Sequence, residues 1–148
     1  MKLVDTHTHI YGEKYDDDFS EVISRAEKEL EFIISIGYDL ESSKKGVELA
    51  KKYDFVYSVV GIHPVDIKKY NDEVEQELTK MATDEPKVVA IGEIGLDYHW
   101  MEDPKDVQIE VFKRQIQLSK DHNLPFIVHT RDAMEDTYKV IKEVGVGP

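Results

Sequence analysis

The chain has 148 residues, a net charge of −12, and 41% hydrophobic against 34% charged residues, which is typical of one soluble domain with its own core. It has no apolar run near the ~20 residues that cross a bilayer and no signal-like N-terminus, so we expect no membrane association and a cytoplasmic location. The lack of cysteine excludes disulfides and thiolate ligands, and the negative charge argues against non-specific adhesion to nucleic acid.

Strand-like apolar runs alternate with helix-like segments along the whole chain. The predicted strands cover residues 2–5, 32–36, 55–60, 87–91 and 125–128. The predicted helices cover residues 19–31, 42–53, 71–81, 105–121 and 132–144. The strands are nearly continuous apolar runs, as in sheets covered on both faces. Since every strand is followed by a helix, we predict right-handed crossovers and a parallel sheet.

Several predicted helices carry signals at their ends or along one face. The acidic run at residues 16–18 suits the start of the first helix, and Asn71 or Asp72 is expected to cap the third. Asp132 is expected to begin the last helix, with Glu135 three residues later as in a capping box. The apolar stripe predicted for the helix at 105–121 consists of Val107, Val111, Phe112, Ile116 and Leu118.

The number of repeating units sets the expected fold. A (β/α)8 barrel of the TIM type takes ~250 residues, or roughly 31 for each unit. The chain holds about five such units and ends in Gly145-Val146-Gly147-Pro148, where a sixth strand is expected to follow. We therefore predict an α/β fold: a single catalytic barrel domain over residues 1–148 that contains about the first five βα units of a TIM-type barrel and is incomplete at its C-terminus.

Four polar clusters follow the predicted strands. They are Asp5-Thr6-His7-Thr8-His9, Gly61-Ile62-His63-Pro64, the segment 92–98 (Gly-Glu-Ile-Gly-Leu-Asp-Tyr) and His129-Thr130-Arg131-Asp132. The carboxyl ends of barrel strands meet at one face, which is where such folds carry their active sites. His, Glu and Asp side chains gathered there predict a metal site built from nitrogen and oxygen donors.

The first cluster has two histidines separated by one residue. In an extended segment, positions i and i+2 project to the same side, so His7 and His9 can reach one ion. Asp5 shares this parity and is suited to orient a ligating histidine from behind. The alternative for the histidines is a polar loop after the strand.

Glu93 and His129 follow strongly apolar strands. A carboxylate directly after residues 88–92 either loses its hydration or coordinates a cation, and the two oxygens of Glu93 allow it to bridge two ions. The alternatives are a Glu93 paired with a basic residue at the sheet edge and a His129 that is hydrogen-bonded in the core.

Three further residues suit substrate contact. His63 has no second histidine nearby in sequence, so contact with a substrate or leaving group fits it better than metal ligation; the alternative is a turn residue fixed by Pro64. Arg131 offers a planar fork of donors for a phosphate, or an ion-pair partner. Tyr98 can stack on a base or sugar, or cover the top of the barrel.

Together, the four clusters resemble the signatures of the TatD family of metal-dependent deoxyribonucleases, within the amidohydrolase-like barrels. The clusters match in order and spacing, Gly37-Tyr38-Asp39 also fits, and the resemblance covers essentially the whole chain. The initial His-x-His is shared more widely among amidohydrolases, whereas the full set of clusters is specific to this family.

The resemblance implies two divalent cations, Mg2+, Mn2+ or Zn2+. His7, His9 and Glu93 would bind one ion, and Glu93 and His129 the other. In the family, a histidine after the sixth strand and an aspartate from a late strand complete the two sites, and neither has a counterpart in these 148 residues. The carboxylates expected to support the ligands are Asp5, Asp97 and Asp132.

The resemblance also implies a 3′-5′ deoxyribonuclease that uses metal-activated water on single-stranded DNA or 3′ ends. Glu93 and His63 would be its catalytic residues, with His63 and Arg131 positioning the phosphate and Tyr98 contacting sugar or base.

Two other interpretations stay open. Related barrels hydrolyse small phosphoesters and amides with the same constellation of side chains. Alternatively, the chain is a truncated, inactive form that associates with a second copy through its open sheet edge, because an unclosed parallel sheet leaves backbone groups unpaired.

Overall fold

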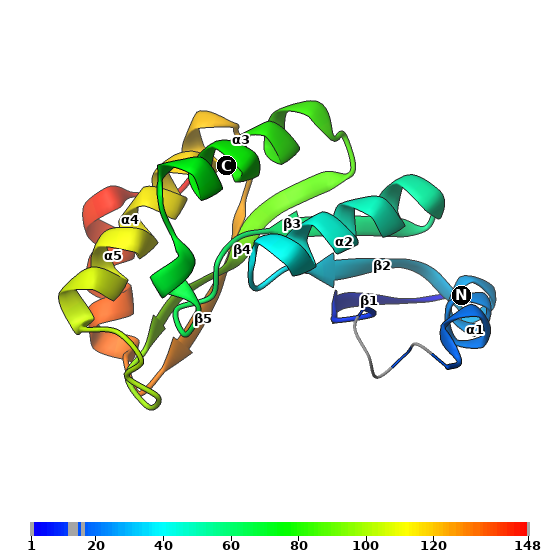
Figure 1. Ribbon diagram of the computed structural model, residues 1–148, viewed down its shortest axis with the longest axis horizontal. Helices are drawn as coiled ribbons and strands as arrows, with labels where there is room; N and C mark the ends of the chain where they lie inside the picture. Colours follow the sequence, from blue (N-terminus) through cyan, green and yellow to red (C-terminus); the bar gives the residue numbers. More distant parts are fainter. Residues whose placement is uncertain (1, 12–14, 16, 148) are drawn as a thin grey trace.

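The chain forms one parallel sheet of five strands in the order β1-β2-β3-β4-β5, with helices packed along it (Figure 1). The computed structural model describes residues 2–11, 15 and 17–147. The strands are β1 (Leu3–Thr8), β2 (Leu30–Ile36), β3 (Val56–Val60), β4 (Val88–Asp97) and β5 (Phe126–Arg131). The helices are α1 (Phe19–Glu29), α2 (Leu40–Lys52), the 3-10 helix η2 (Ile67–Lys69), α3 (Asp72–Asp84), α4 (Lys105–Asp121) and α5 (Met134–Val144).

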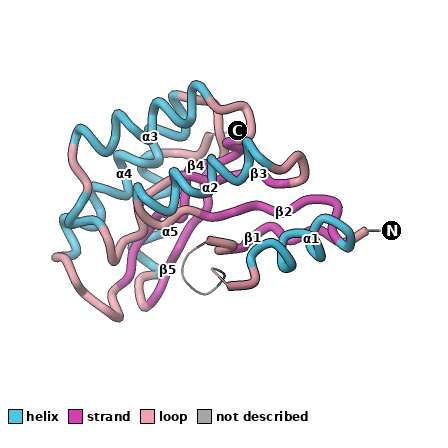
Figure 2. Tube along the Cα trace, turned by 45° about the vertical axis from the view of Figure 1, so that its right-hand side comes forward, coloured by secondary structure: helices cyan, strands magenta, loops and turns pink. Residues whose placement is uncertain are grey.

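Each strand pairs in parallel with the next strand in the sequence. The return path between paired strands is in each case a helix, as the tube in Figure 2 shows. Sequential parallel pairing with helical crossovers is the topology of a (β/α)8 barrel. The predicted fold class is therefore confirmed, and the five strands form half of such a barrel.

Three strands extend beyond their predicted C-terminal ends. β1 reaches Thr8, which lies opposite Ser35 of β2. β4 and β5 remain paired up to Asp97, which lies opposite Arg131. The first, third and fourth polar clusters therefore lie wholly or partly inside paired strands, where the ladder fixes their backbone.

The helix ends agree with the sequence in part. Asn71 caps α3, accepting a hydrogen bond from the Val74 amide at 2.9 Å. The capping role predicted for Asp132 is wrong: α5 is capped at Ala133 without a side-chain hydrogen bond, and Asp132 has a φ of 54°. The α1 cap Asp18 likewise makes no capping bond, and residue 16 lies outside the described residues.

Helix α4 begins and ends as predicted, at Lys105 and Asp121. Of its predicted apolar stripe, only Val107 is misplaced: this side chain is 40% exposed, and Gln108 is buried beside it. The correctly predicted stripe residues are Val111, Phe112, Ile116 and Leu118.

The core separates into layers on the two faces of the sheet. A Cβ added at Gly46 of α2 would meet the hydroxyls of Ser35 and Ser58, so these strand residues face the helix. Because side chains alternate along a strand, Ile36 and Val59 face the other way, and they form a cluster with Ala90. Within the described ranges, none of the helices is long and apolar enough to span a membrane.

Candidate metal centre

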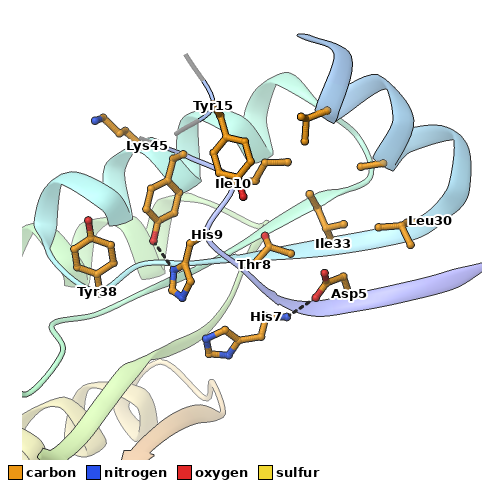
Figure 3. Close-up of a pocket in the computed structure, with 13 residues that line it drawn as sticks. Asp5, His7, Thr8, His9, Ile10, Tyr15, Leu30, Ile33, Tyr38 and Lys45 are labelled. Carbon is orange, nitrogen blue, oxygen red and sulfur yellow. Dashed lines mark hydrogen bonds between the residues drawn. The ribbon is translucent and has the colours of Figure 1, made fainter. Parts of the chain in front are cut away.

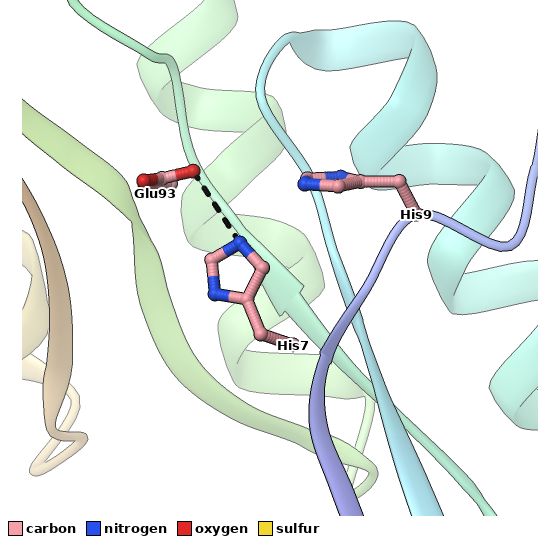
Figure 4. Close-up of side chains that lie close together, drawn as sticks. All are labelled: His7, His9 and Glu93. Carbon is pink, nitrogen blue, oxygen red and sulfur yellow. Dashed lines mark ion pairs between the residues drawn. The ribbon is translucent and has the colours of Figure 1, made fainter.

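The polar clusters meet around the carboxylate of Glu93, which β4 carries at its carboxyl half. His7 of β1 approaches one oxygen, with Nε2 3.7 Å from Oε2 of Glu93 (Figure 4). His129 of β5 approaches the other, with Nδ1 3.3 Å from Oε1. Each oxygen of one carboxylate therefore faces a different histidine.

Two sets of donors share this carboxylate. His7, His9 and Glu93 form the first set, and His63, Glu93 and His129 form the second. Within each set the donor atoms lie within 4.8 Å of one another. Imidazole and carboxylate donors at this separation fit a divalent cation, so the described residues offer two adjoining groups that could each hold one.

The orientation of the His9 ring agrees with this assignment. Its Nδ1 lies 3.0 Å from the carbonyl oxygen of Ile36, which also accepts a hydrogen bond from the Tyr11 hydroxyl. A carbonyl oxygen can only accept, so Nδ1 carries the proton and Nε2 keeps its lone pair. Figure 4 shows the His9 ring directed towards Glu93.

His63 lies within the second donor set, whereas the sequence pointed to substrate contact for this residue. Its ring centroid is 4.1 Å from that of His129, and its Nδ1 accepts a hydrogen bond from the Val65 amide at 3.3 Å. This leaves Nε2 for a ligand. Burial, and then the charge of His129, lower the pKa of His63, which favours the neutral imidazole that a cation needs. The available signal was its position after β3, equivalent to His9 after β1.

Asp97 at the end of β4 holds the far side of the His129 ring. Its Oδ2 lies 3.0 Å from Nε2 of His129, and its Oδ1 accepts hydrogen bonds from the amides of His99 and Trp100 at 2.9 Å. Asp97 is only 2% exposed. Burial raises its pKa, but the Trp100 amide and the His129 hydrogen bond outweigh it, so the pKa is lowered overall and the carboxylate stays charged.

Hydrogen bonding also couples Glu93 and His129. The His129 hydrogen bond is the main cause of the lowered pKa of Glu93, and the Glu93 hydrogen bond is the main cause of the raised pKa of His129. Each group thus favours the charged form of the other in the absence of a cation.

The other predicted supporting carboxylates contact different groups. Asp5 accepts a hydrogen bond from the backbone amide of His7 at 3.1 Å, so its contact is with the backbone rather than with an imidazole. Asp132 lies 3.3 Å from Nδ1 of His99. Asp5 thus contacts the backbone of a donor, whereas Asp132 contacts a histidine outside both donor sets.

The predicted substrate-binding residues Tyr98 and Arg131 lie on the side of α4 and α5. The Tyr98 hydroxyl donates to Asp136 at 3.0 Å, and the Lys105 ammonium lies 4.0 Å from its ring centroid. Burial raises the pKa of Tyr98 to about 12. The Arg131 guanidinium lies 5.6 Å from the ring of Trp100, so an exposed cation and an indole meet at this rim.

A cavity of about 1020 Å3 adjoins the first donor set (Figure 3). Its polar end is formed by His7 and His9, and the rings of Tyr15 and Tyr38 also line it. Apolar side chains of α1 and β2 form another part of its lining. The donors are therefore accessible from a space of ligand size.

Glycines allow the strands to approach closely beneath the donors. A Cβ at Gly95, whose φ is 148°, would lie 1.9 Å from the carbonyl oxygen of His129. A Cβ at Gly61 would lie within 3 Å of three backbone atoms of Gly92. Side chains at these points would push β3, β4 and β5 apart and separate His63, Glu93 and His129.

The chain matches known proteins along nearly its whole length. The family model described as TatD related DNase matches residues 4–147. The uncharacterized metal-dependent hydrolase YabD of Bacillus subtilis is 47% identical over 144 residues, which are 97% of this chain and 56% of YabD. The 3'-5' ssDNA/RNA exonuclease TatD of Cronobacter turicensis is 34% identical over 132 residues, 88% of this chain and 50% of that protein.

The fold matches in the same way. The crystal structure of YjjV, a TatD homologue from Escherichia coli, superposes with a TM-score of 0.83 at 28% identity, covering 96% of this chain and 56% of YjjV. The chain thus spans about half the length of the relatives that it matches. Since the family model covers all but a few terminal residues and the donors occupy the expected strand ends, the chain belongs to the TatD-related DNase family.

Proposed function

We propose that this chain provides the metal-binding half of a divalent-metal-dependent hydrolase that cleaves phosphodiester bonds of DNA from a 3′ end. The observation that carries the proposal is the division of the Glu93 carboxylate between two histidine groups. The name of the Cronobacter relative, a 3'-5' ssDNA/RNA exonuclease, supports the substrate class and direction.

Two divalent cations bound to these sets would supply water activation and neutralise charge developing on the phosphoryl oxygens. The protein's own part is to hold the donors at a fixed separation. Glu93 keeps the two sets in register, Asp97 holds the ring of His129, and the Ile36 carbonyl holds the ring of His9.

Substrate contacts would come from the rim and the cavity. Arg131 is exposed beside Trp100, where its planar guanidinium can bind a phosphate and the indole can stack on a base. Tyr38 and Tyr15 line the cavity that begins at His9, and their rings offer a second stacking surface. In this proposal His63 would hold a cation together with Glu93 and His129, and that cation would offset charge on the phosphate.

The test is cleavage by the 148-residue chain with Mg2+, Mn2+ or Zn2+. Substrates are single-stranded DNA labelled at either end, matching RNA, a small chromogenic phosphodiester and a chromogenic amide. Glu93→Gln keeps the shape of the side chain but removes the charge that two cations need. We expect it to lower metal-stimulated cleavage by at least about a hundredfold, equivalent to ~2.7 kcal/mol of transition-state stabilisation.

Glu48→Gln, at an exposed position of α2, is the matched control and should keep wild-type activity. Cleavage that survives Glu93→Gln would contradict the proposal. Turnover of only the small phosphodiester or the amide would replace DNA with a small-molecule substrate. Cation binding without turnover of any substrate would show that the chain binds the cations but does not catalyse hydrolysis by itself.

A further inference from the structure

Two buried glutamines on α4 point at the strand ends that carry the donors. Gln108 and Gln115 are each only 1% exposed. They are seven residues apart, which is two helical turns, so they share one face of the helix. Amide side chains are seldom fully buried unless all their hydrogen bonds are made.

Gln115 pairs with the peptide groups of Ile62, the residue before His63. The Ile62 amide donates to Oε1 of Gln115 at 2.8 Å, and Nε2 of Gln115 donates to the Ile62 carbonyl at 3.0 Å. This two-way contact replaces the strand partner that Ile62 lacks beyond the end of β3. It fixes the backbone from which the His63 ring projects.

Gln108 makes the same kind of contact with Asp97. The Asp97 amide donates to Oε1 of Gln108 at 2.8 Å, and Nε2 of Gln108 donates to the carbonyls of Asp97 and Asp103 at 3.0 Å. Asp97 in turn holds Nε2 of His129. The contact therefore fixes the backbone of the residue that orients a donor.

We propose that Gln108 and Gln115 are positioning residues for the second donor set, through which α4 sets the separation of His63 and His129. Because both glutamines project from one helix, the distance between them is fixed. Gln115 fixes the backbone before His63, and Gln108 fixes the backbone of Asp97, whose carboxylate contacts His129. The inference deepens the proposed function and rests on it, because it assigns a cation to this donor set. Among the described residues, the two glutamines make no hydrogen bond to the strand that carries His7 and His9, so we expect the first set to be unaffected.

The test separates positioning from general support of the fold by isolating each donor set in the 148-residue chain. In a His7→Ala background the second set remains intact, and in a His129→Ala background the first set does. Gln108→Met and Gln115→Met keep side-chain length but remove the hydrogen bonds. Gln117→Met is the matched control, since Gln117 is exposed on the same helix and its side chain donates to Asp121 rather than to a strand end.

Co2+ affinity, measured by calorimetry and visible absorption, is the first readout. In the His7→Ala background, we expect Gln108→Met and Gln115→Met to raise the Kd about tenfold or more, as loss of supporting contacts does at metal sites. In the His129→Ala background, we expect the same two substitutions to change the Kd less than twofold. Gln117→Met should leave the Kd unchanged in both backgrounds. Equal weakening of both sets, or of neither, would overturn the proposal.

The second readout needs no cation and keeps this inference distinct from the proposed function. In the metal-free chain, the ring proton on Nε2 of His129 is held by Asp97, so nitrogen-15 NMR of labelled histidine should detect it. Gln108→Met should remove this signal, and Gln115→Met should speed exchange of the Val65 amide, which donates to His63, at least tenfold. If the wild type binds no Co2+, the proposed function fails, while unchanged NMR signals in both variants would reject positioning.

Discussion

Asp97 occupies the Nε2 side of the His129 ring at 3.0 Å, so that only Nδ1 is directed towards Glu93. A carboxylate behind a histidine fixes its tautomer and raises its basicity as a metal ligand. The buried Asp97 is itself held by two backbone amides, so the ring has little freedom to turn.

Replacing Asp97 by Asn tests this relationship. Asn keeps the acceptor for the His99 and Trp100 amides but removes the charge behind His129. We expect Co2+ affinity of the second donor set to fall 10- to 100-fold, a range of about 1.4 to 2.7 kcal/mol. Calorimetry in the His7→Ala background measures it. Asp132→Asn, at a carboxylate that contacts His99 instead, should change this affinity less than twofold.

The two neighbouring histidines should titrate in opposite directions in the metal-free chain. The Glu93 hydrogen bond raises the pKa of His129, whereas burial and the charge of His129 lower the pKa of His63, both from an ordinary value of 6.5. On lowering the pH, His129 should therefore protonate before His63. NMR titration of the imidazoles measures the order, and the reverse order would contradict the geometry.

These shifts also affect stability, with opposite signs. His129, with a folded pKa above its unfolded value, contributes stability that is complete below pH 6.5 and is lost as the pH rises through the folded pKa. His63, with a folded pKa below its unfolded value, contributes stability that is complete above pH 6.5 and is lost as the pH falls through the folded pKa. In urea unfolding of the metal-free chain, His129→Asn should remove the first dependence and keep the part of the second that comes from the burial of His63.

Gly95→Ala should be strongly destabilising. The new Cβ would lie 1.9 Å from the His129 carbonyl oxygen, and φ is 148°, so overpacking and backbone strain add. Each costs about 1 to 3 kcal/mol, and we expect a loss of about 3 kcal/mol or more in urea unfolding. Gly145→Ala is the control for strain alone: its φ is 80°, but the nearest atom to its Cβ is Lys120 Nζ at 3.8 Å. A similar cost for both variants would refute the clash.

The sheet edges predict self-association of the 148-residue chain. Among the described residues, β1 pairs only with β2 and β5 only with β4, and Leu3 and Val4 of β1 are 66% and 48% exposed. We propose that a second copy covers this edge, since unpaired strand edges recruit further strands. Sedimentation velocity from micromolar concentrations upward should detect dimers. Val4→Lys should weaken them, while Tyr138→Lys, at a more exposed site on α5, should not.

The sequence predicts elements well where the signal is local. Helix α4 has the predicted bounds because Pro104 stands directly before it and the turn that leads to Pro125 follows it. The strand ends were predicted less well, because β4 continues to Asp97 only through its pairing with β5, and pairing is not a property of one segment. Asp132 has the side chain of a helix cap, but its left-handed backbone and its contact with His99 exclude it from that role.

The sequence predicts which strand ends carry the candidate site, but it does not predict the distances and contacts between the side chains. That His7, His9, Glu93 and His129 would gather followed from the topology, and the structure brings them together. The contact of His63 with His129 joins the loop after β3 to β5, two strands that in the described sheet pair with β4 and not with each other, and no local pattern encodes it. Buried glutamines leave a weak signal: Gln108 and Gln115 are polar residues on the apolar side of α4.

The shared carboxylate of Glu93 has a consequence for loading the site with cations. Because its two oxygens belong to different donor sets, the binding equilibria of the two sets are linked through one side chain. If binding of one cation changes the affinity for the other by a certain factor, binding of the other must change the affinity for the first by the same factor. In the proposed two-cation site the ions would therefore share one coupling free energy, and a substitution that weakens the binding of one ion would also shift the occupancy of the other.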